Sequence, residues 1–231
     1  MLNKLKLKVM KGIKKLRDGL TMERIEADFT WLLESDIEDA VVGCNEYGIV
    51  WYSGTWNNGT WDCGLWKSGI WNGGTWDIGT WNSGFWQDGT WRNGIWESGI
   101  WKIGIWKNGV WHGGTWQNGN WNNGGWYGGE WEGGAWTNGI WAYGTWKDGN
   151  WNDGTWKGGV WDNGNWKNGV WYNGIWYDGT WKNGRWDNGT WYNGTLYDGT
   201  WKNGTWRDGV WKDGIWNNGT WINGIGKPKN A

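Results

Sequence analysis

The residue types that most often perform chemistry are few in this sequence and lie far apart. His112 is the single histidine of the 231-residue chain, and the two cysteines, Cys44 and Cys63, form no CxxC pair or disulfide framework. Acid–base catalysis needs a second titratable group held beside the first, and a metal site needs several ligands at fixed spacing. The carboxylates are instead scattered singly. We therefore expect no catalytic site, no metal, no cofactor and no enzyme activity.

The glycines also lack the spacing that phosphate binding requires. Neither GxxxxGK nor a strand-linked GxGxxG occurs among the 46 glycines. They belong instead to a five-residue repeat, W-x-x-G-x, which runs without a break for thirty-five units from Trp51 to Ile225. The fourth position is always Gly, and the first is always Trp except at Leu196. The fifth position is Thr, Ile or Val in twenty-six units, and the third is Asn or Asp in twenty-two.

This pattern predicts an all-β architecture. Each unit joins a β-favouring Thr-Trp-x triplet to a turn-favouring Asn-Gly or Asp-Gly pair, and Gly at every fifth residue excludes helix. We favour a four-sided β-solenoid of twenty residues per coil and about nine coils, with Trp inward and Gly at the corners. The predicted core and corner positions include the following: Trp51, Gly54, Trp56, Gly59, Leu196, Trp221.

A flat meander with a two-residue turn at each Asn-Gly is the alternative architecture. Its tryptophans would all line one face, which would have to pair with a second layer because so large an apolar surface is not tolerated on a monomer. An exposed Trp face of this kind would favour binding of carbohydrate or single-stranded nucleic acid.

The array resembles a tryptophan–glycine variant of the pentapeptide-repeat proteins. Leu196, preceded by Gly194, and the upstream Ala27-Asp28-Phe29 match that family most closely. The resemblance implies a right-handed four-sided β-helix, and some members mimic DNA and bind topoisomerases. Trp for Leu or Phe, and Gly for Ala, are departures throughout residues 51–225. The W-x-N-G-T sequence pattern is also weakly similar to that of repeat proteins of large tailed phages.

The segments around the array predict a cap at one end only. Residues 1–20 have apolar residues at helical spacing between lysines and predict a basic amphipathic helix, followed by an acidic transition or cap over 21–50 that contains a strand-like alternation at 25–31. The tail, residues 226–231, is too short to cover a Trp-lined coil. We expect this uncapped C-terminal end to bind protein partners or a second copy, giving a homo-oligomer or a larger assembly.

Outward columns of a twenty-residue coil suggest two binding surfaces. One column carries threonines such as Thr180, Thr200 and Thr220, which could suit ice. The other is a mostly basic stripe that could bind a polyanion: Lys67, Lys107, Lys147, Lys167, Arg207.

The function that we expect is structural: a rigid rod, spacer or adhesive element in a larger assembly, such as a phage tail fibre or another virion component. The alternatives are a surface-recognition module for ice or glycan, and a DNA mimic that regulates a topoisomerase. With 22 basic and 23 acidic residues, the chain has no net field toward nucleic acid or membrane. No signal peptide or membrane span is evident, which favours a virion or cytoplasmic location.

Overall fold

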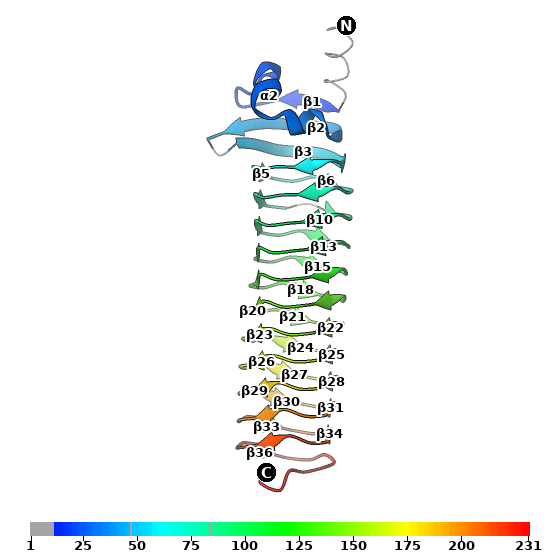
Figure 1. Ribbon diagram of the computed structural model, residues 1–231, viewed down its shortest axis with the longest axis vertical. Helices are drawn as coiled ribbons and strands as arrows, with labels where there is room; N and C mark the ends of the chain where they lie inside the picture. Colours follow the sequence, from blue (N-terminus) through cyan, green and yellow to red (C-terminus); the bar gives the residue numbers. More distant parts are fainter. Residues whose placement is uncertain (1–11, 47, 84) are drawn as a thin grey trace. The chain divides into compact units, whose positions relative to one another are not determined.

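The fold is a β-solenoid, as the repeat predicts. The computed structural model describes residues 12–46, 48–83 and 85–231, and the chain divides into two compact units, residues 1–110 and 111–231. From Trp61 onward, a two-residue strand ends at the first residue of every repeat unit. Each of these strands pairs in parallel with the strand fifteen residues away. Figure 1 shows this stacking for β20, β23 and β26 (Ile140–Trp141, Thr155–Trp156, Val170–Trp171).

The N-terminal unit begins with three longer strands and two helices. These are β1 (Ile13–Leu16), α2 (Met22–Asp28), α3 (Thr30–Leu33), β2 (Asp36–Asn45) and β3 (Gly48–Asn58). Its two-residue strands follow in chain order: β4 (Thr60–Trp61), β5 (Leu65–Trp66), β6 (Ile70–Trp71), β7 (Thr75–Trp76), β8 (Thr80–Trp81), β9 (Phe85–Trp86), β10 (Thr90–Trp91), β11 (Ile95–Trp96), β12 (Ile100–Trp101), β13 (Ile105–Trp106) and β14 (Val110–Trp111), whose second residue opens the next unit.

The C-terminal unit has three sides, which we number. Side one consists of β17 (Gly125–Trp126), β20, β23, β26, β29 (Arg185–Trp186), β32 (Thr200–Trp201) and β35 (Ile215–Trp216). Side two consists of β15 (Thr115–Trp116), β18 (Glu130–Trp131), β21 (Thr145–Trp146), β24 (Val160–Trp161), β27 (Ile175–Trp176), β30 (Thr190–Trp191), β33 (Thr205–Trp206) and β36 (Thr220–Trp221). Side three consists of β16 (Asn120–Trp121), β19 (Ala135–Trp136), β22 (Asn150–Trp151), β25 (Asn165–Trp166), β28 (Thr180–Trp181), β31 (Thr195–Leu196) and β34 (Val210–Trp211).

The expected four-sided coil is wrong, because each coil has three sides and fifteen residues. Trp51 lies in register with Trp66, and Trp161 with Trp176. Thirty-five units at three per coil make eleven coils and two further units, rather than about nine coils. The size of the indole explains the difference. Three indoles meeting edge to face already fill the interior, whereas a fourth side would leave a void at the axis.

The core of each unit consists of stacked indole rings. Rings fifteen residues apart lie 4.6 to 5.1 Å apart between centroids and are 4 to 9° from parallel. Rings five residues apart meet edge to face at 5.7 to 6.1 Å and 70 to 77°. The indole nitrogens of Trp146 and Trp166 find no hydrogen-bond acceptor among the described residues. Stacking and the exclusion of water therefore hold these rings.

The invariant glycines form the corners. Every repeat glycine that the structure describes has φ between 105 and 140°. At Gly169, a Cβ atom would lie 2.5 Å from the carbonyl oxygen of Gly154 in the preceding coil and 3.2 Å from Cζ2 of Trp166. Both the backbone conformation and the contact between coils therefore require glycine, which confirms the predicted corner role.

The N-terminal segment differs from the predicted helix. Residues 1–11 lie outside the described residues, and Ile13–Leu16 is strand β1, parallel to β2, rather than helix. The alternation at 25–31 is helical, so Ala27-Asp28-Phe29 is not part of a coil. Its apolar residues become the inner face of α2 and α3, where Ile25 and Leu32 are buried. Trp31 contacts the first coil, since its ring lies 5.1 Å from that of Trp61.

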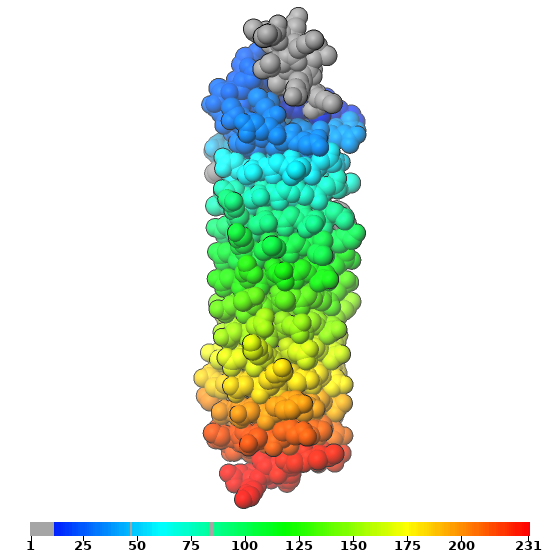
Figure 2. Space-filling model, turned by 45° about the vertical axis from the view of Figure 1, so that its right-hand side comes forward, coloured from blue at the N-terminus to red at the C-terminus, as the bar shows by residue number. Residues whose placement is uncertain are grey.

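The C-terminal coil is more covered than the sequence suggests. The backbone N–H of Trp211 donates to the carbonyl of Ile225 at 2.9 Å, and residues 226–230 line a hollow of about 530 Å³ with Trp211 and Trp216. Gly226 makes this approach possible, because a Cβ there would strike the Trp211 carbonyl. Trp211 and Trp216 are consequently buried, while Trp221 is half-buried. Figure 2 shows the red tail against this last coil.

Candidate functional site

The three-sided coil disperses both outward columns that were predicted for a four-sided one. Lys167 follows a strand of side three, whereas Lys147 and Arg207 follow strands of side two. Lys67 and Lys107 follow β5 and β13 of the other unit. The predicted basic stripe therefore does not exist as one row. The threonine row fails in the same way, since Thr180, Thr200 and Thr220 belong to three different sides.

Members of the predicted stripe make local contacts instead. The Lys67 ammonium lies 4.2 Å from the ring centroid of Tyr52, and the Arg207 guanidinium lies 4.8 Å from that of Tyr192. Lys147 forms an ion pair with Glu130, and this hydrogen bond raises the lysine pKa above its ordinary value. Each of these three cations therefore contacts a side chain that precedes it by fifteen to seventeen residues, in the neighbouring coil.

A different group of cations gathers at one corner of the C-terminal unit. Two consecutive coils there contain the segments Lys167-Asn168-Gly169 and Lys182-Asn183-Gly184-Arg185. The backbone N–H of Asn183 donates to the carbonyl of Lys167 at 3.1 Å, so the two segments lie directly beside each other. We call these seven residues the basic corner. It separates side three, which carries the lysines, from side one, which carries Arg185.

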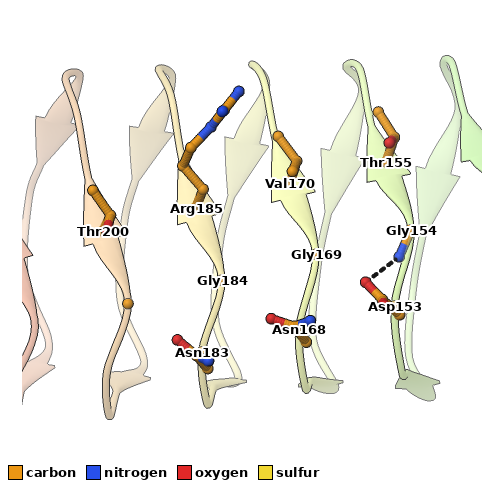
Figure 3. A pocket seen from close by; sticks show the side chains of 11 residues that line it. Asp153, Gly154, Thr155, Asn168, Gly169, Val170, Asn183, Gly184, Arg185 and Thr200 are labelled. Carbon is orange, nitrogen blue, oxygen red and sulfur yellow. Dashed lines mark hydrogen bonds between the residues drawn. The ribbon is translucent and has the colours of Figure 1, made fainter.

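Hollows lie on both sides of the basic corner. On side one, a groove of about 510 Å³ crosses four coils, with glycines along its floor, Asn168 and Asn183 on one wall and Arg185 on the other (Figure 3). On side three, a smaller hollow of about 220 Å³ is lined by Lys167, Lys182 and the following residues: Asn150, Trp151, Asn152, Asn165. The glycine corners explain the side-one groove, because the missing side chains leave a channel between the third and fifth positions of the repeat.

The polar groups of the basic corner are largely unused by the fold. Neither Lys167 nor Lys182 forms an ion pair with any residue that the structure describes. The carboxamides of Asn168 and Asn183 likewise make no hydrogen bond within the described part of the chain. By contrast, Asp153 in the same groove accepts from the Gly154 N–H at 2.7 Å. The corner therefore offers two cations and two amides to solvent.

The Arg185 side chain is held by contacts with residues of side one. Its Nη2 atom lies 2.8 Å from Oδ2 of Asp187, which raises the pKa of the guanidinium, and Lys202 lies 3.6 Å from Oδ1 of the same carboxylate. The Arg185 Nε atom is buried and has no acceptor among the described residues. The guanidinium also lies 5.7 Å from the ring centroid of Tyr172. This network fixes a third cation beside the free amides.

The predicted chemical residues remain apart. His112 packs edge to face with Tyr127, and the free cysteines lie at different places, Cys44 buried and Cys63 half-buried. Burial raises the Cys63 pKa, and Asp62 raises it further. Among residues 12–46, 48–83 and 85–231, no three His, Cys, Asp or Glu side chains are grouped as metal ligands. None of the described helices is long and apolar enough to cross a membrane.

Two comparisons with known proteins were negative. No protein-family model matches the chain, and a search of curated proteins gives no significant match.

Proposed function

We propose that this protein is a non-enzymatic structural protein, a rigid Trp-cored element of a larger assembly. The observation that carries the proposal is the parallel stacking of indoles within each unit, at 4.6 to 5.1 Å. Aromatic pairs stabilise by about 0.5 to 1.5 kcal/mol beyond burial of their area. Each coil also donates backbone N–H groups to the preceding one, as Lys182 does to Trp166 at 2.8 Å. Bending such a unit would separate many of these contacts together.

The last coil of the C-terminal unit supplies the contact surface that we propose for this assembly. Ile215, Ile222 and Ile225 are exposed there by 60, 59 and 71%, and Trp221 is half-buried beside them. Apolar side chains gathered in one coil favour association because their burial against a partner removes them from water. We propose a protein partner or a second copy, within a virion component such as a tail fibre.

The test compares two sets of isoleucine substitutions in the full chain. Ile222→Lys with Ile225→Lys places charge on the proposed contact surface, whereas Ile140→Lys alters an exposed isoleucine of side one that lies five coils before the last coil. Sedimentation velocity and electron microscopy should detect oligomers or filaments of the wild type and of Ile140→Lys, and their loss in the double variant. Wild-type protein that stays monomeric at all concentrations, or a double variant that still assembles, would refute self-association through this coil.

A further inference from the structure

The geometry points to a second property, independent of the association proposed above: the basic corner binds an acidic polysaccharide, a linear glycan that bears carboxylate or sulfate groups. Like charges directly opposite each other on neighbouring strands are destabilising. Lys167 and Lys182 are such a pair, and no carboxylate of the described residues neutralises them. The fold gains nothing from this arrangement, whereas an anionic ligand would use both charges.

A comparison within the chain supports this interpretation. Arg92 and Lys107 also follow strands one coil apart, in the N-terminal unit. There a counter-charge is built in, because Arg92 Nη1 lies 3.2 Å from Oδ1 of Asp77. The basic corner lacks a counterpart of Asp77 for its lysines. The nearby Asp187, on side one, neutralises Arg185 instead.

The neutral groups of the corner suit the hydroxyl groups of a sugar. The free carboxamides of Asn168 and Asn183 each offer donors and an acceptor, and Asn165 and Asn150 continue this surface on side three, joined by a 3.1 Å hydrogen bond. The side-one groove adds the hydroxyls of Thr155 and Thr200. None of the residues that line this groove has an aromatic side chain on which an unpaired base could stack. These groups favour a glycan over a nucleic acid.

The distance between neighbouring coils indicates a linear ligand with regularly repeated anionic groups. Successive coils repeat at the strand separation of roughly 4.8 Å, so Lys167 and Lys182 present cations at this interval along the side-three hollow, on the other side of the corner from the groove. An extended acidic polysaccharide that runs across successive coils would carry an anionic group on each of several consecutive sugars. Carboxylates on neighbouring sugars could then meet the two lysines while the sugar hydroxyls face the asparagines. Sulfate groups on the sugars could supply the same charges.

Six aspartates at the edges of side three set a limit on the strength of binding. They accept from the N–H of the glycine that follows each of them, at 2.6 to 2.8 Å, and so point into the corners: Asp148, Asp153, Asp178, Asp198, Asp208, Asp213. Their field opposes long-range attraction of an anion. We therefore expect binding by short-range contacts, with modest affinity that weakens as salt is added.

The experiment measures binding of the full-length protein to four polymers: a polyuronate, a sulfated polysaccharide, neutral dextran and a single-stranded polynucleotide. Saturable binding to either acidic polysaccharide, and none to dextran, is expected. The first two distinguish carboxylate from sulfate as the preferred group. A polynucleotide bound more tightly than both acidic polysaccharides would overturn the glycan assignment, as would the lack of saturable binding to either one.

Three double variants test the site itself. Lys167→Gln with Lys182→Gln should weaken binding about tenfold or more, because both charge-assisted hydrogen bonds to the ligand are lost. Lys102→Gln with Lys107→Gln makes the same change in net charge elsewhere and should alter affinity less than about twofold. Asn168→Ala with Asn183→Ala should weaken binding about threefold to tenfold without any change in charge. Equal losses in the two lysine variants would show nonspecific attraction and refute the corner as the site.

Discussion

Leu196 lies in register between Trp181 and Trp211 on side three, so that a leucine interrupts a column of indoles. The neighbouring columns continue past it, with Trp186 and Trp201 stacked at 4.7 Å. Leu196 is buried, yet it is smaller than the ring that it replaces. The third stack is therefore broken at this one coil.

Leu196→Trp should restore the stack and stabilise the C-terminal unit. Two new ring contacts contribute about 0.5 to 1.5 kcal/mol each, and strain from fitting a larger side chain offsets part of this gain. We expect a net gain of about 1 kcal/mol, measured as a higher urea midpoint. Trp181→Leu is the matched control, since it should extend the gap and lower the midpoint. A destabilised Leu196→Trp variant would show that the backbone has adapted to leucine there.

Gly158 and Gly159 give a direct test of the corner. Gly159 has φ of 116°, and a Cβ there would lie 2.4 Å from the Gly144 carbonyl oxygen. At Gly158 a Cβ would be 3.5 Å from the Tyr143 ring, which is ordinary contact. Gly159→Ala should therefore cost about 2 to 4 kcal/mol of stability, whereas Gly158→Ala should change it by less than about 1 kcal/mol. Thermal unfolding would measure both, and similar losses would contradict the steric explanation.

Aspartate and asparagine alternate along the corner that precedes side three, in six consecutive coils: Asp148, Asn163, Asp178, Asn193, Asp208, Asn223. Asn223 Nδ2 lies 3.3 Å from Oδ2 of Asp208, so an amide can donate to the neighbouring carboxylate. The alternation keeps carboxylates two coils apart. Asn193→Asp would place three in a row and should destabilise the unit by about 1 kcal/mol at low salt.

Asn203→Asp provides the control for that substitution. It adds the same charge in a corner column where Asn188 and Asn218 are its neighbours, so little repulsion is expected. Urea titrations at low salt and at 1 M salt should show the difference between the two variants shrink as salt screens the charges. A difference that does not respond to salt would mean that packing, rather than repulsion, decides the alternation.

The Cys63 thiol should react slowly with iodoacetamide. Burial raises its pKa and the Asp62 carboxylate raises it further, so that less thiolate is present at pH 8 than for a free cysteine. A pH series of alkylation rates followed by mass spectrometry should give a midpoint above that of a model thiol. Asp62→Asn removes the smaller of the two effects and should shift the midpoint down. A midpoint at or below that of the model thiol would contradict this account.

The sequence predicted the solenoid but not the number of its sides. A five-residue unit with an identical inward residue fits three or four sides equally well, so the core positions cannot reveal where one coil ends. The outward residues do contain this information. Ser53, Ser68, Ser83 and Ser98 occur fifteen residues apart, and the Asp/Asn alternation appears only at this period. The basic corner was missed for this reason, because Lys167 and Lys182 become neighbours only in a fifteen-residue coil.

The end segments were predicted less well because tertiary contacts decide them. Helical spacing of apolar residues at 13–16 could not show that β2 was available for pairing with this segment. Similarly, alternation around Ile25 suits a strand, but the Thr21 hydroxyl accepts from the Arg24 N–H and caps a helix instead. A threonine with helix-compatible residues after it was the local signal for α2.

The three sides of the C-terminal unit share the same inward indoles but carry different outward side chains. This difference limits which gains and losses of repeat units preserve the surface of the protein. Gain or loss of a single five-residue unit by recombination would leave the indoles stacked and the coils closed. Every later outward residue would nevertheless move to the next side, so that a change between Lys167 and Lys182 would separate the two lysines. Changes in multiples of three units preserve these neighbours. Recombination among near-identical repeats can thus create new combinations of outward residues on each side while the indole core stays the same. Once natural selection maintains one such surface, only gains or losses of whole coils preserve it.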